Sequence, residues 1–275
     1  EGNGLFTEET KNSAKAVVQV SDAASVAYLL DGWEETMLWS YLQGYMGRAY
    51  AVGMPPRSAQ VLVGSFCFFS GQPEEALVRN IPPDFQEECL LMVPRQSAWQ
   101  PLIEAVYAER ASRIQRYAIK KEPWIFDREK LNNYAESIPE GYRLAPIDEK
   151  IYFETKKAEW SHDLTSQFSS YEQYRKYGLG IAALCGRELV AGASSYTVYD
   201  GGIEIQIDTQ LKHRRKGLAA ACGAKLILEC LERGLYPSWD AHDRRSAALA
   251  EKLGYHVSHS YIAYCVSVPK APAQP

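Results

Sequence analysis

The sequence predicts an α/β protein with mixed sheets, built as two domains. Its 275 residues are 46% hydrophobic and 23% charged, which is ordinary for a soluble globular protein. At roughly 150 residues per domain, this length predicts two domains. Segments with helical spacing alternate with β-branched and aromatic runs along the whole chain. Because a polar stretch over 121–141 separates two patterned halves, we place the domains at 1–137 and 138–275.

The first half is predicted to alternate helices and strands. Residues 5–50 are expected to be helical, because Met37, Leu38 and Tyr41 recur at helical spacing before a stop at 53–56. The remaining elements follow from runs bounded by Pro and Gly: one long strand or two short ones at 59–69, a helix at 74–79, a strand at 89–93, a helix at 97–109 capped by Ser97, and a strand at 113–120.

The second half has a clearer pattern, introduced by a connecting helix over 127–136. Its strands are expected at 142–145, 179–184, 189–199, 203–208 and 238–241, with a strand pair or one bent strand over 255–268. Its helices are expected from 147 or 148 to 160, at 171–177, at 216–233 before Gly234, and at 246–253. The tail, 269–275, has a composition typical of disorder.

Composition argues against several classes of protein. The net charge of -4 disfavours a nucleic-acid binder, and no run of 18 apolar residues predicts a membrane span. The chain starts without a signal-peptide pattern, so a cytoplasmic location is the default expectation. No pair of cysteines has zinc-site spacing, so we expect no metal and free thiols in a reducing cytosol; the six are Cys67, Cys89, Cys185, Cys222, Cys230 and Cys265.

A strand, a basic loop and a long helix follow one another over 203–235. The loop contains Arg214-Arg215-Lys216-Gly217-Leu218-Ala219. A helix N-terminus exposes unpaired backbone N–H groups and a partial positive charge, so that an anionic phosphate fits there. Gly217 allows close approach of the backbone, and the basic side chains add charge. Taken alone, the pattern also fits an ordinary solvated helix cap.

The order of elements favours the phosphate site over the solvated cap. A hairpin, a third strand, the Gly217 loop, a long helix, a short strand and a helix ending in Lys252-Leu253-Gly254-Tyr255 follow in sequence. With Arg-x-x-Gly-x-Ala at Arg214–Ala219, residues 140–275 resemble the GNAT superfamily of acyl-CoA-dependent N-acetyltransferases. The resemblance covers about half of the chain and implies a splayed mixed sheet in the C-terminal domain.

The resemblance implies acetyl-CoA as the acyl donor and an amine as the acceptor. The coenzyme A pyrophosphate would lie over the loop, and the pantetheine arm would run beside the strand 203–209. The thioester would lie at the splay between this strand and 238–241, where a backbone N–H would stabilise the oxyanion. The implied coenzyme A-binding residues are Ile207, Asp208, Thr209, Arg214, Arg215, Lys216, Gly217, Leu218, Ala219, Asp243 and Ser246.

Two positions depart from the family pattern. Where many members carry a Tyr as general acid toward the leaving thiolate, this chain has Ala250, and Asp243 stands where an Asn usually opens the same helix. Ser246, one turn before Ala250, is a candidate substitute, as is a water molecule. A free amine needs little acid assistance, because a thiolate is a tolerable leaving group, so this departure does not exclude catalysis.

Three residues are candidates for the base that deprotonates the amine. Glu204 and Asp208 share one face of their strand, although this face also fits a solvated surface. His242 follows a short strand, at the edge where open sheets place ligands, and a structural or surface role is its alternative. Trp239 and Asp240 are candidates for lining the acceptor pocket, with a core position as the alternative for Trp239.

The first domain lacks an Arg-x-x-Gly-x-Ala run, so a degenerate GNAT-like half is one interpretation of its α/β order. This domain would form one wall of the acceptor site or contribute to a subunit interface, such as that of a homodimer. For the whole chain we weigh an N-acetyltransferase against a degenerate GNAT that senses acyl-CoA without turnover and against a structural protein. The sequence does not identify the acceptor amine.

Overall fold

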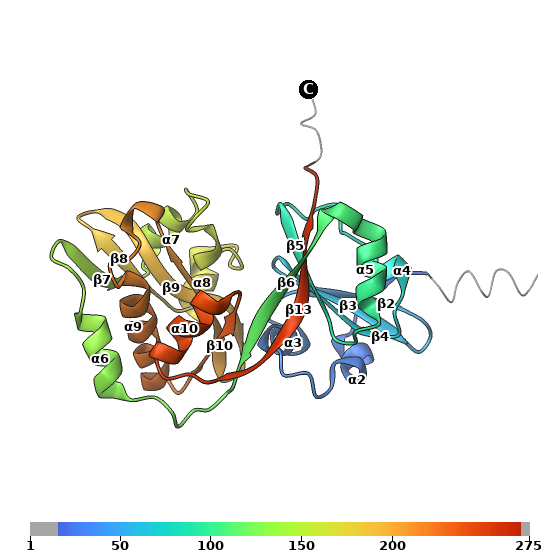
Figure 1. The fold of residues 1–275 in the computed structure, drawn as a ribbon, viewed down its shortest axis with the longest axis horizontal. Helices are drawn as coiled ribbons and strands as arrows, with labels where there is room; N and C mark the ends of the chain where they lie inside the picture. The colour runs from blue at the N-terminus through green and yellow to red at the C-terminus, as the bar shows by residue number, and fades with distance from the viewer. Residues whose placement is uncertain (1–15, 271–275) are drawn as a thin grey trace, which may run out of the picture. The chain divides into compact units, whose positions relative to one another are not determined.

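The computed structural model of the chain describes residues 16–270 and divides them between two compact units. Unit 1 contains the chain up to Gln115 together with the segment from Ile262 onward, and unit 2 contains Arg116–Tyr261. The compact units therefore do not follow the predicted division into 1–137 and 138–275, which stays a prediction. Figure 1 shows the elements of both units.

Unit 1 is built on an antiparallel meander with one parallel pair. The strands follow in the order β1-β2-β3-β4-β5-β13, with β4 and β5 parallel. Its strands are β1 (Val18–Gln19), β2 (Arg48–Val52), β3 (Ser58–Val63), β4 (Phe66–Gly71) and β5 (Cys89–Pro94). Its helices are η1 (Ala23–Val26), α2 (Ala27–Leu30), α3 (Thr36–Leu42), α4 (Glu75–Val78), α5 (Trp99–Tyr107) and η2 (Ala108–Arg110).

Two predictions in unit 1 are corrected by the structure. The long helix expected over 5–50 is replaced from residue 16 onward by short helices and the strands β1 and β2, and 5–15 lie outside the described residues. Ser97 does not cap α5, which has Ala98 at its N-cap and no side-chain cap. The two short strands over 59–69 are confirmed, because the turn between β3 and β4 divides that run.

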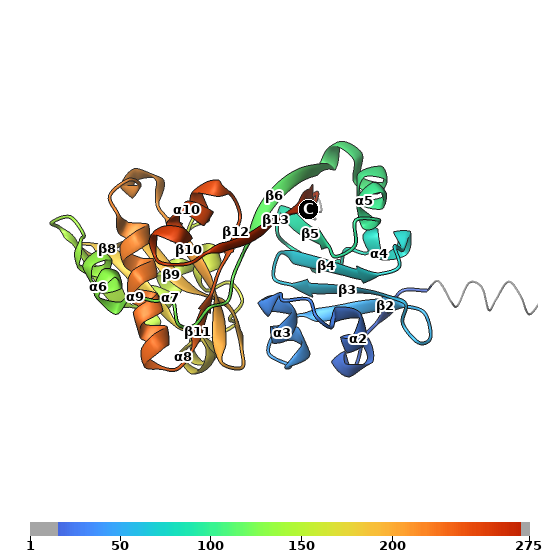
Figure 2. The same cartoon turned by 60° about the horizontal axis from the view of Figure 1, so that its bottom comes forward.

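Unit 2 is a five-stranded sheet in the order β11-β10-β9-β8-β7, covered by helices (Figure 2). Its strands are β7 (Tyr142–Pro146), β8 (Gly180–Cys185), β9 (Glu188–Tyr199), β10 (Gly202–Thr209), β11 (Tyr236–Ser238) and, outside this sheet, β12 (Asp240–Ala241). Its helices are α6 (Arg128–Glu136), α7 (Glu149–Thr155), η3 (His162–Leu164), α8 (Tyr171–Tyr177), η4 (Leu211–His213), α9 (Leu218–Glu232) and α10 (Arg244–Lys252).

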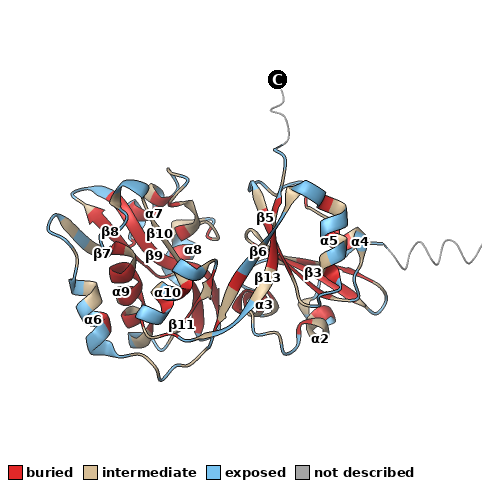
Figure 3. Ribbon diagram, viewed as in Figure 1, coloured by how far each residue is buried: buried red, intermediate tan, exposed pale blue. Residues whose placement is uncertain are grey.

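The elements of unit 2 follow the predicted order closely. Helix α8 has the predicted bounds, whereas α7 ends at Thr155 rather than near 160. Asp127 and Asp148 cap α6 and α7, because each carboxylate accepts from backbone N–H groups of the first turn. Figure 3 shows that β8 and β9 are buried almost throughout, so they form the centre of this unit.

Two long strands contribute residues to both units. Strand β6 (Ala111–Ile119) passes from unit 1 into unit 2, and β13 (Val257–Ser267) passes back. The terminal segment is therefore one long strand rather than a pair. Tyr264 and Val266 of β13 are fully buried in the core of unit 1, where this strand pairs antiparallel with β5.

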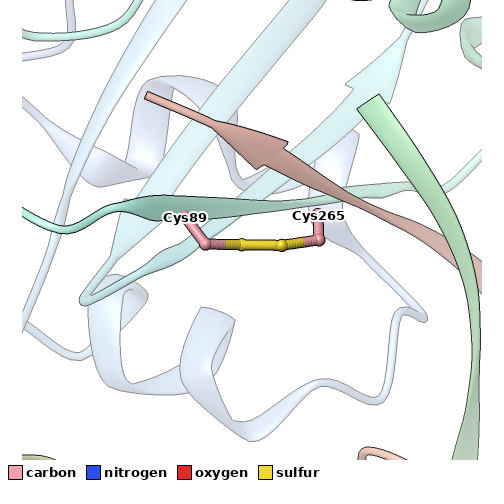
Figure 4. Close-up of a disulfide and its surroundings, with 2 residues drawn as sticks. All are labelled: Cys89 and Cys265. Atoms are coloured by element: carbon pink, nitrogen blue, oxygen red, sulfur yellow. A yellow bond between two sulfur atoms is a disulfide. The ribbon is translucent and has the colours of Figure 1, made fainter. Parts of the chain in front are cut away.

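The cysteines correct one expectation about oxidation state. Cys89 of β5 and Cys265 of β13 form a disulfide with a Cα–Cα distance of 5.9 Å, although 176 residues separate them (Figure 4). The expectation of free thiols fails at these two positions because strands from opposite ends of the chain are neighbours. It holds for the four others, Cys67, Cys185, Cys222 and Cys230.

Candidate active site

Strand β10 has two chemically different faces. Its isoleucines share the face toward helix α9, since a Cβ on Gly223 of α9 would lie 3.1 Å from Ile207. Glu204, Gln206 and Asp208 share the opposite face by alternation. The elements η3 and α8 cover that face. Leu164 of η3 packs against Gly192 of β9, which pairs with Asp208. The hydroxyl of Tyr174 on α8 lies 2.8 Å from that of Ser194 of β9, which pairs with Gln206.

The sheet of unit 2 opens beside β10. Strand β11 runs parallel to β10 and pairs with it only as far as Glu204 and Ser238. Two residues later, Asp240 and Ala241 pair with β6 instead. The predicted strand over 238–241 is therefore two short strands on different neighbours. Among the described strands, none pairs with the β11 side of β10 over 205–209, which leaves backbone donors and acceptors at this edge.

A buried ion pair holds β12 on β6. The Arg116 Nη2 lies 2.9 Å from Asp240 Oδ1, with side chains 9% and 11% exposed. Tyr261 donates its hydroxyl to the same carboxylate at 2.8 Å. Burial acts to lower the pKa of Arg116, but the Asp240 charge and Tyr261 outweigh it, so that the net pKa is raised and the guanidinium stays charged. Asp240 is thus an anchor of the splayed strand.

The loop after β10 is held in place by its own hydrogen bonds. The backbone N–H of Gln210 donates to Val190 O at 2.8 Å, and Arg214 Nε donates to Thr209 O at 3.4 Å. The His213 Nδ1 lies 2.7 Å from the hydroxyl of Tyr142 on β7. These contacts fix the path of the chain up to the basic segment, so that the loop reaches the start of α9 in a defined geometry.

The start of α9 has no side-chain cap on its first backbone N–H groups. Helix α9 begins at Leu218, two residues after the predicted start at Lys216. Gly217 has φ +77° and Arg215 has φ +63°, the left-handed region that glycine tolerates best. The backbone N–H of Ala221 donates to Gly217 O in the first turn, so the amides of 218–220 precede the first i to i+4 bond of the helix. Residues 214–217 are exposed, and such a turn suits an anion.

Asp208 lies toward the loop end of β10 and has an altered acidity. Burial raises the pKa of its carboxyl to about 6, and the negative charge of Asp163 adds to the effect. Two groups act to lower this pKa. They are the side-chain amide of Gln206, which donates to Asp208 Oδ2 at 2.9 Å, and the positive charge of Arg214. The carboxyl therefore titrates close to neutral pH.

Glu204 lies at the point where the pairing of β10 with β11 ends. It is 6% exposed and stands opposite Thr197 of β9 and Ser238 of β11. The hydroxyls of Ser238 and Tyr199 are 2.7 Å apart. Burial raises the pKa of Tyr199, with the Glu204 charge adding to it and the Ser238 hydrogen bond opposing it, so this phenol stays protonated. Glu204 is thus in a dense polar cluster.

The predicted residues around α10 have structural partners. Asp243 caps this helix by accepting from the Ser246 amide at 2.8 Å, and Trp239 Nε1 donates to the Ser246 hydroxyl oxygen at 3.1 Å. His242 Nε2 lies 3.3 Å from Asp243 Oδ2, with 66% of its side chain exposed. Ala250 is fully buried. The arrangement brings Asp243, Ser246 and Trp239 together, while His242 points largely to solvent.

Sequence reasoning missed Thr197, Tyr199, Arg116 and Asp163. Thr197 and Tyr199 belong to the long hairpin strand β9, and only their register opposite β10 gives them significance. Arg116 is 124 residues from Asp240, so no local pattern connects the two. Within 16–270, no group of three His, Cys, Asp or Glu side chains has the arrangement of a metal site. No helix of the same region is long and apolar enough to cross a membrane.

Known proteins share this architecture. A GCN5-related N-acetyltransferase-like protein from Streptococcus suis 89/1591 superposes with a TM-score of 0.84 and 41% identity, covering 89% of this chain and 98% of that one. A tandem GNAT protein from the clavulanic acid biosynthesis pathway, 10% identical, shares the fold with a TM-score of 0.54 over 93% of this chain and 99% of that one.

Sequence comparison leads to the same family. The uncharacterized N-acetyltransferase YdfB of Bacillus subtilis (strain 168) is 27% identical over 168 residues. That match covers 60% of this chain and 62% of the relative, less than two thirds of its length. The sequence profile of the GNAT acetyltransferase family matches residues 27–264, which include parts of both units. The chain therefore belongs to the GNAT acetyltransferase family.

Proposed function

We propose that the chain is an acetyl-CoA-dependent N-acetyltransferase that transfers an acetyl group to an amine. The observation that carries this proposal is the open edge of β10, which starts at Glu204 and leads to the uncapped N-terminus of α9. An extended thiol-bearing arm can add to such an edge as a strand would, with its phosphate end at the helix. The family membership supports the same donor.

The residues of the loop fit a pyrophosphate. The amides of Arg215, Gly217, Leu218 and Ala219 would bind its oxygens, because Gly217 is exposed and a Cβ there would meet only Ser137 O, at 3.7 Å, within 4 Å. Arg214 and Lys216 add positive charge at the surface. The edge over 205–209, including Ile207, Asp208 and Thr209, would pair with the pantetheine arm. Asp243 and Ser246 at the start of α10 would border the thiol end.

Among the candidate bases, the geometry favours Glu204. It lies where the splay begins, whereas Asp208 lies nearer the phosphate loop and the side chain of His242 is largely exposed. Acetyl-CoA supplies an activated acetyl thioester when bound. Glu204 would take one proton from the ammonium group, the nitrogen would form the C–N bond while the C–S bond breaks, and the second proton would pass from the nitrogen to water as the amide forms. A backbone N–H at the β10 edge stabilises the oxyanion.

A proton for the departing thiolate has to come from a group other than residue 250. Ala250 is buried and has no hydroxyl. Ser246 is the nearest substitute on the same helix, and its oxygen already accepts from Trp239, so its own O–H is oriented away from the indole. We assign the proton to a water molecule, either directly or through Ser246, which would receive a proton from water as it gives up its own.

The buried Ala250 also motivates the alternative, a degenerate GNAT that binds acyl-CoA as a sensor without turnover. The two functions differ in one measurement. The enzyme releases free coenzyme A thiol when a suitable amine is present, and Glu204→Gln abolishes this release while it keeps acetyl-CoA binding. A sensor binds acetyl-CoA with the same affinity in both proteins and releases no thiol with any primary amine.

We propose that unit 1 is a degenerate GNAT-like half. The segment β3-β4-α4-β5-α5 repeats the order of β9-β10-α9-β11-α10 in unit 2. Strands β4 and β5 stay paired from Phe66 to Phe69, and the helix between them is α4 with 4 residues rather than 15 as in α9. Within the described residues of unit 1, this segment therefore lacks the open strand edge and the long helix on which the proposed donor site of unit 2 depends. The fold shared with the tandem GNAT protein supports this interpretation.

The phosphate loop is tested with two matched glycine variants. Gly217→Glu puts a carboxylate at the start of α9, where it would repel a pyrophosphate. Gly234→Glu puts the same side chain just after the end of α9, also at a positive φ, +68° against +77°. The affinity for acetyl-CoA is measured by calorimetry. We expect Gly217→Glu to weaken it at least tenfold and Gly234→Glu to leave it unchanged. Equal affinity in both variants, or no binding to the unaltered chain, would refute the proposed site.

A further inference from the structure

A row of three polar side chains crosses the sheet of unit 2 where the splay begins. Thr197 of β9 stands opposite Glu204 of β10, which stands beside Ser238 of β11. Their exposed fractions are 0%, 6% and 2%. Residues that face each other across strands have Cβ atoms roughly 5 Å apart and point to the same side. The three side chains therefore form one buried cluster.

The register of β9 places Thr197 in this row. The pairing shifts between Glu204 and Ile205, so that Thr197 and Ser195 oppose them and Tyr196 is an extra residue of β9. Without this bulge, the residue opposite Glu204 would be Tyr196. Bulges of this kind re-aim side chains and are frequent beside active sites. The bulge thus presents a hydroxyl rather than an aromatic ring to Glu204.

The hydroxyl of Thr197 lacks a hydrogen-bond partner. Within the described residues, three buried side-chain oxygens or nitrogens are unpartnered, on Ser40, Thr197 and Gln210, and of these only Thr197 lies in the row with Glu204. Ser238, at the other end of the row, is already bonded to Tyr199. A buried hydroxyl without a partner destabilises the fold, so the position is explained if a ligand supplies the missing bond.

We propose that the Thr197 hydroxyl, together with the Glu204 carboxylate, binds and orients the amino group of the acceptor. This inference rests on the proposed N-acetyltransferase function. A primary ammonium carries three N–H donors, so it can bond the Glu204 carboxylate and the Thr197 hydroxyl oxygen together. Each N-methyl group would remove one donor and add volume beside the fully buried Thr197. The carboxylate that binds the ammonium is also the group that takes its proton.

The neighbouring residues limit the size of the amino head. Tyr199 lies over Gly202, where a Cβ would come within 2.2 Å of the phenol oxygen. This ring closes the row on the side away from the phosphate loop, and its hydrogen bond to Ser238 holds it there. An unbranched carbon next to the nitrogen fits such a site better than a branched one.

Thr197→Val is the variant that tests the inference, because it removes the hydroxyl at nearly constant volume. Thr197→Ser keeps the hydroxyl, and Ser194→Ala is the control, since it removes a β9 hydroxyl whose partner is Tyr174. The probe is propylammonium chloride, compared with tetramethylammonium chloride at equal concentration. Melting of the protein saturated with coenzyme A is measured with each salt.

We expect propylammonium to raise the melting temperature of the unaltered chain more than tetramethylammonium does. Thr197→Val should bind propylammonium about tenfold more weakly, the effect of one hydrogen bond. The same variant should melt no lower than the unaltered chain without amine, because an unpartnered hydroxyl has been removed. Thr197→Ser and Ser194→Ala should keep the propylammonium response.

Two results would overturn the inference. One is an equal response of the unaltered chain to both salts, and the other is a Thr197→Val protein that melts lower and still responds to propylammonium. Acetyl-CoA binding is measured separately by calorimetry. If the chain binds acetyl-CoA but does not distinguish the two salts, only the proposed acceptor site is refuted. If the chain does not bind acetyl-CoA, the proposed function itself is refuted.

Discussion

At the scale of single residues, the face of β10 carries two carboxylates in different environments. Glu204 is enclosed by hydroxyls at the start of the splay, and Asp208 lies toward the loop end, between Asp163 and Arg214. Their shared face was predictable, because alternation along a strand is a local property. Their different surroundings were not, because Ser238 and Asp163 come from distant parts of the chain and Thr197 faces Glu204 only through a register shift in the hairpin.

The raised pKa of Asp208 predicts a pH-dependent cost in stability. Its pKa of about 6 in the folded chain lies above the unfolded value of 3.8, so the folded state holds its proton more tightly. The contribution of this carboxyl to the free energy of unfolding is fully present below the unfolded pKa, and it is lost as the pH rises to about 6. Asp208→Asn should therefore stabilise the chain above pH 6 by about 3 kcal/mol at most, and by nothing near pH 3.5.

Urea unfolding of both proteins at pH 4, 6 and 8 measures this effect. The difference between the free energies of unfolding should grow from pH 4 to 6 and stay constant to pH 8. A difference that is independent of pH, or an Asn variant that is less stable at pH 8, would show that the carboxylate is well solvated.

At the scale of elements, the splay depends on where β12 finds its partner. After Ser238 the chain leaves β10, and Asp240 pairs with β6 through the ion pair with Arg116. A buried carboxylate and guanidinium stabilise each other, whereas removal of one leaves the other charge uncompensated. The ion pair is thus expected to keep the edge of β10 open for the donor.

Asp240→Asn should destabilise the chain by about 3 to 5 kcal/mol, because it strands the Arg116 charge. The control is Glu232→Gln, which breaks the ion pair with Arg128, where both side chains are more than half exposed. That exposed pair should contribute less than about 1 kcal/mol. Chemical denaturation compares the two, and similar losses would contradict the anchoring role of Asp240.

At the scale of the whole molecule, the compact units interleave along the chain. Unit 1 takes its last strand from the C-terminal segment, with Tyr264 and Val266 buried in its core, and unit 2 takes β6 from the segment before the predicted boundary. The GNAT profile match over 27–264 fits this arrangement, since it is not confined to the half that contains Arg214–Ala219.

This organisation predicts how fragments behave. A fragment of residues 138–275 lacks Arg116 and the β6 partner of β12, and it carries Tyr264 and Val266 without the core that buries them. We expect it to aggregate or to melt without cooperativity. A fragment of 116–261 retains all of unit 2 and should melt cooperatively. Circular dichroism and gel filtration measure both, and a cooperative fold of the first fragment alone would support the division at 137/138.

The amino-acid sequence by itself determined the local elements and the donor motif. Strand alternation over 203–208, the helices expected over 127–136 and from 147 or 148, and the run from Arg214 to Ala219 are patterns within a few residues, and the helices and strands of unit 2 follow them. The family resemblance rested on the same local patterns and is confirmed by the comparisons.

Only the tertiary structure decided which strands are neighbours. It divided the expected strand over 238–241 between β10 and β6, paired Arg116 with Asp240, joined Cys89 to Cys265 and placed Thr197 opposite Glu204. Such contacts depend on register and on closing long loops, and neither leaves a periodic trace in the sequence. The residues of the proposed donor site were therefore predictable from a local pattern, whereas those of the proposed acceptor site depend on the register of the β9–β10 hairpin and on the later strand β11.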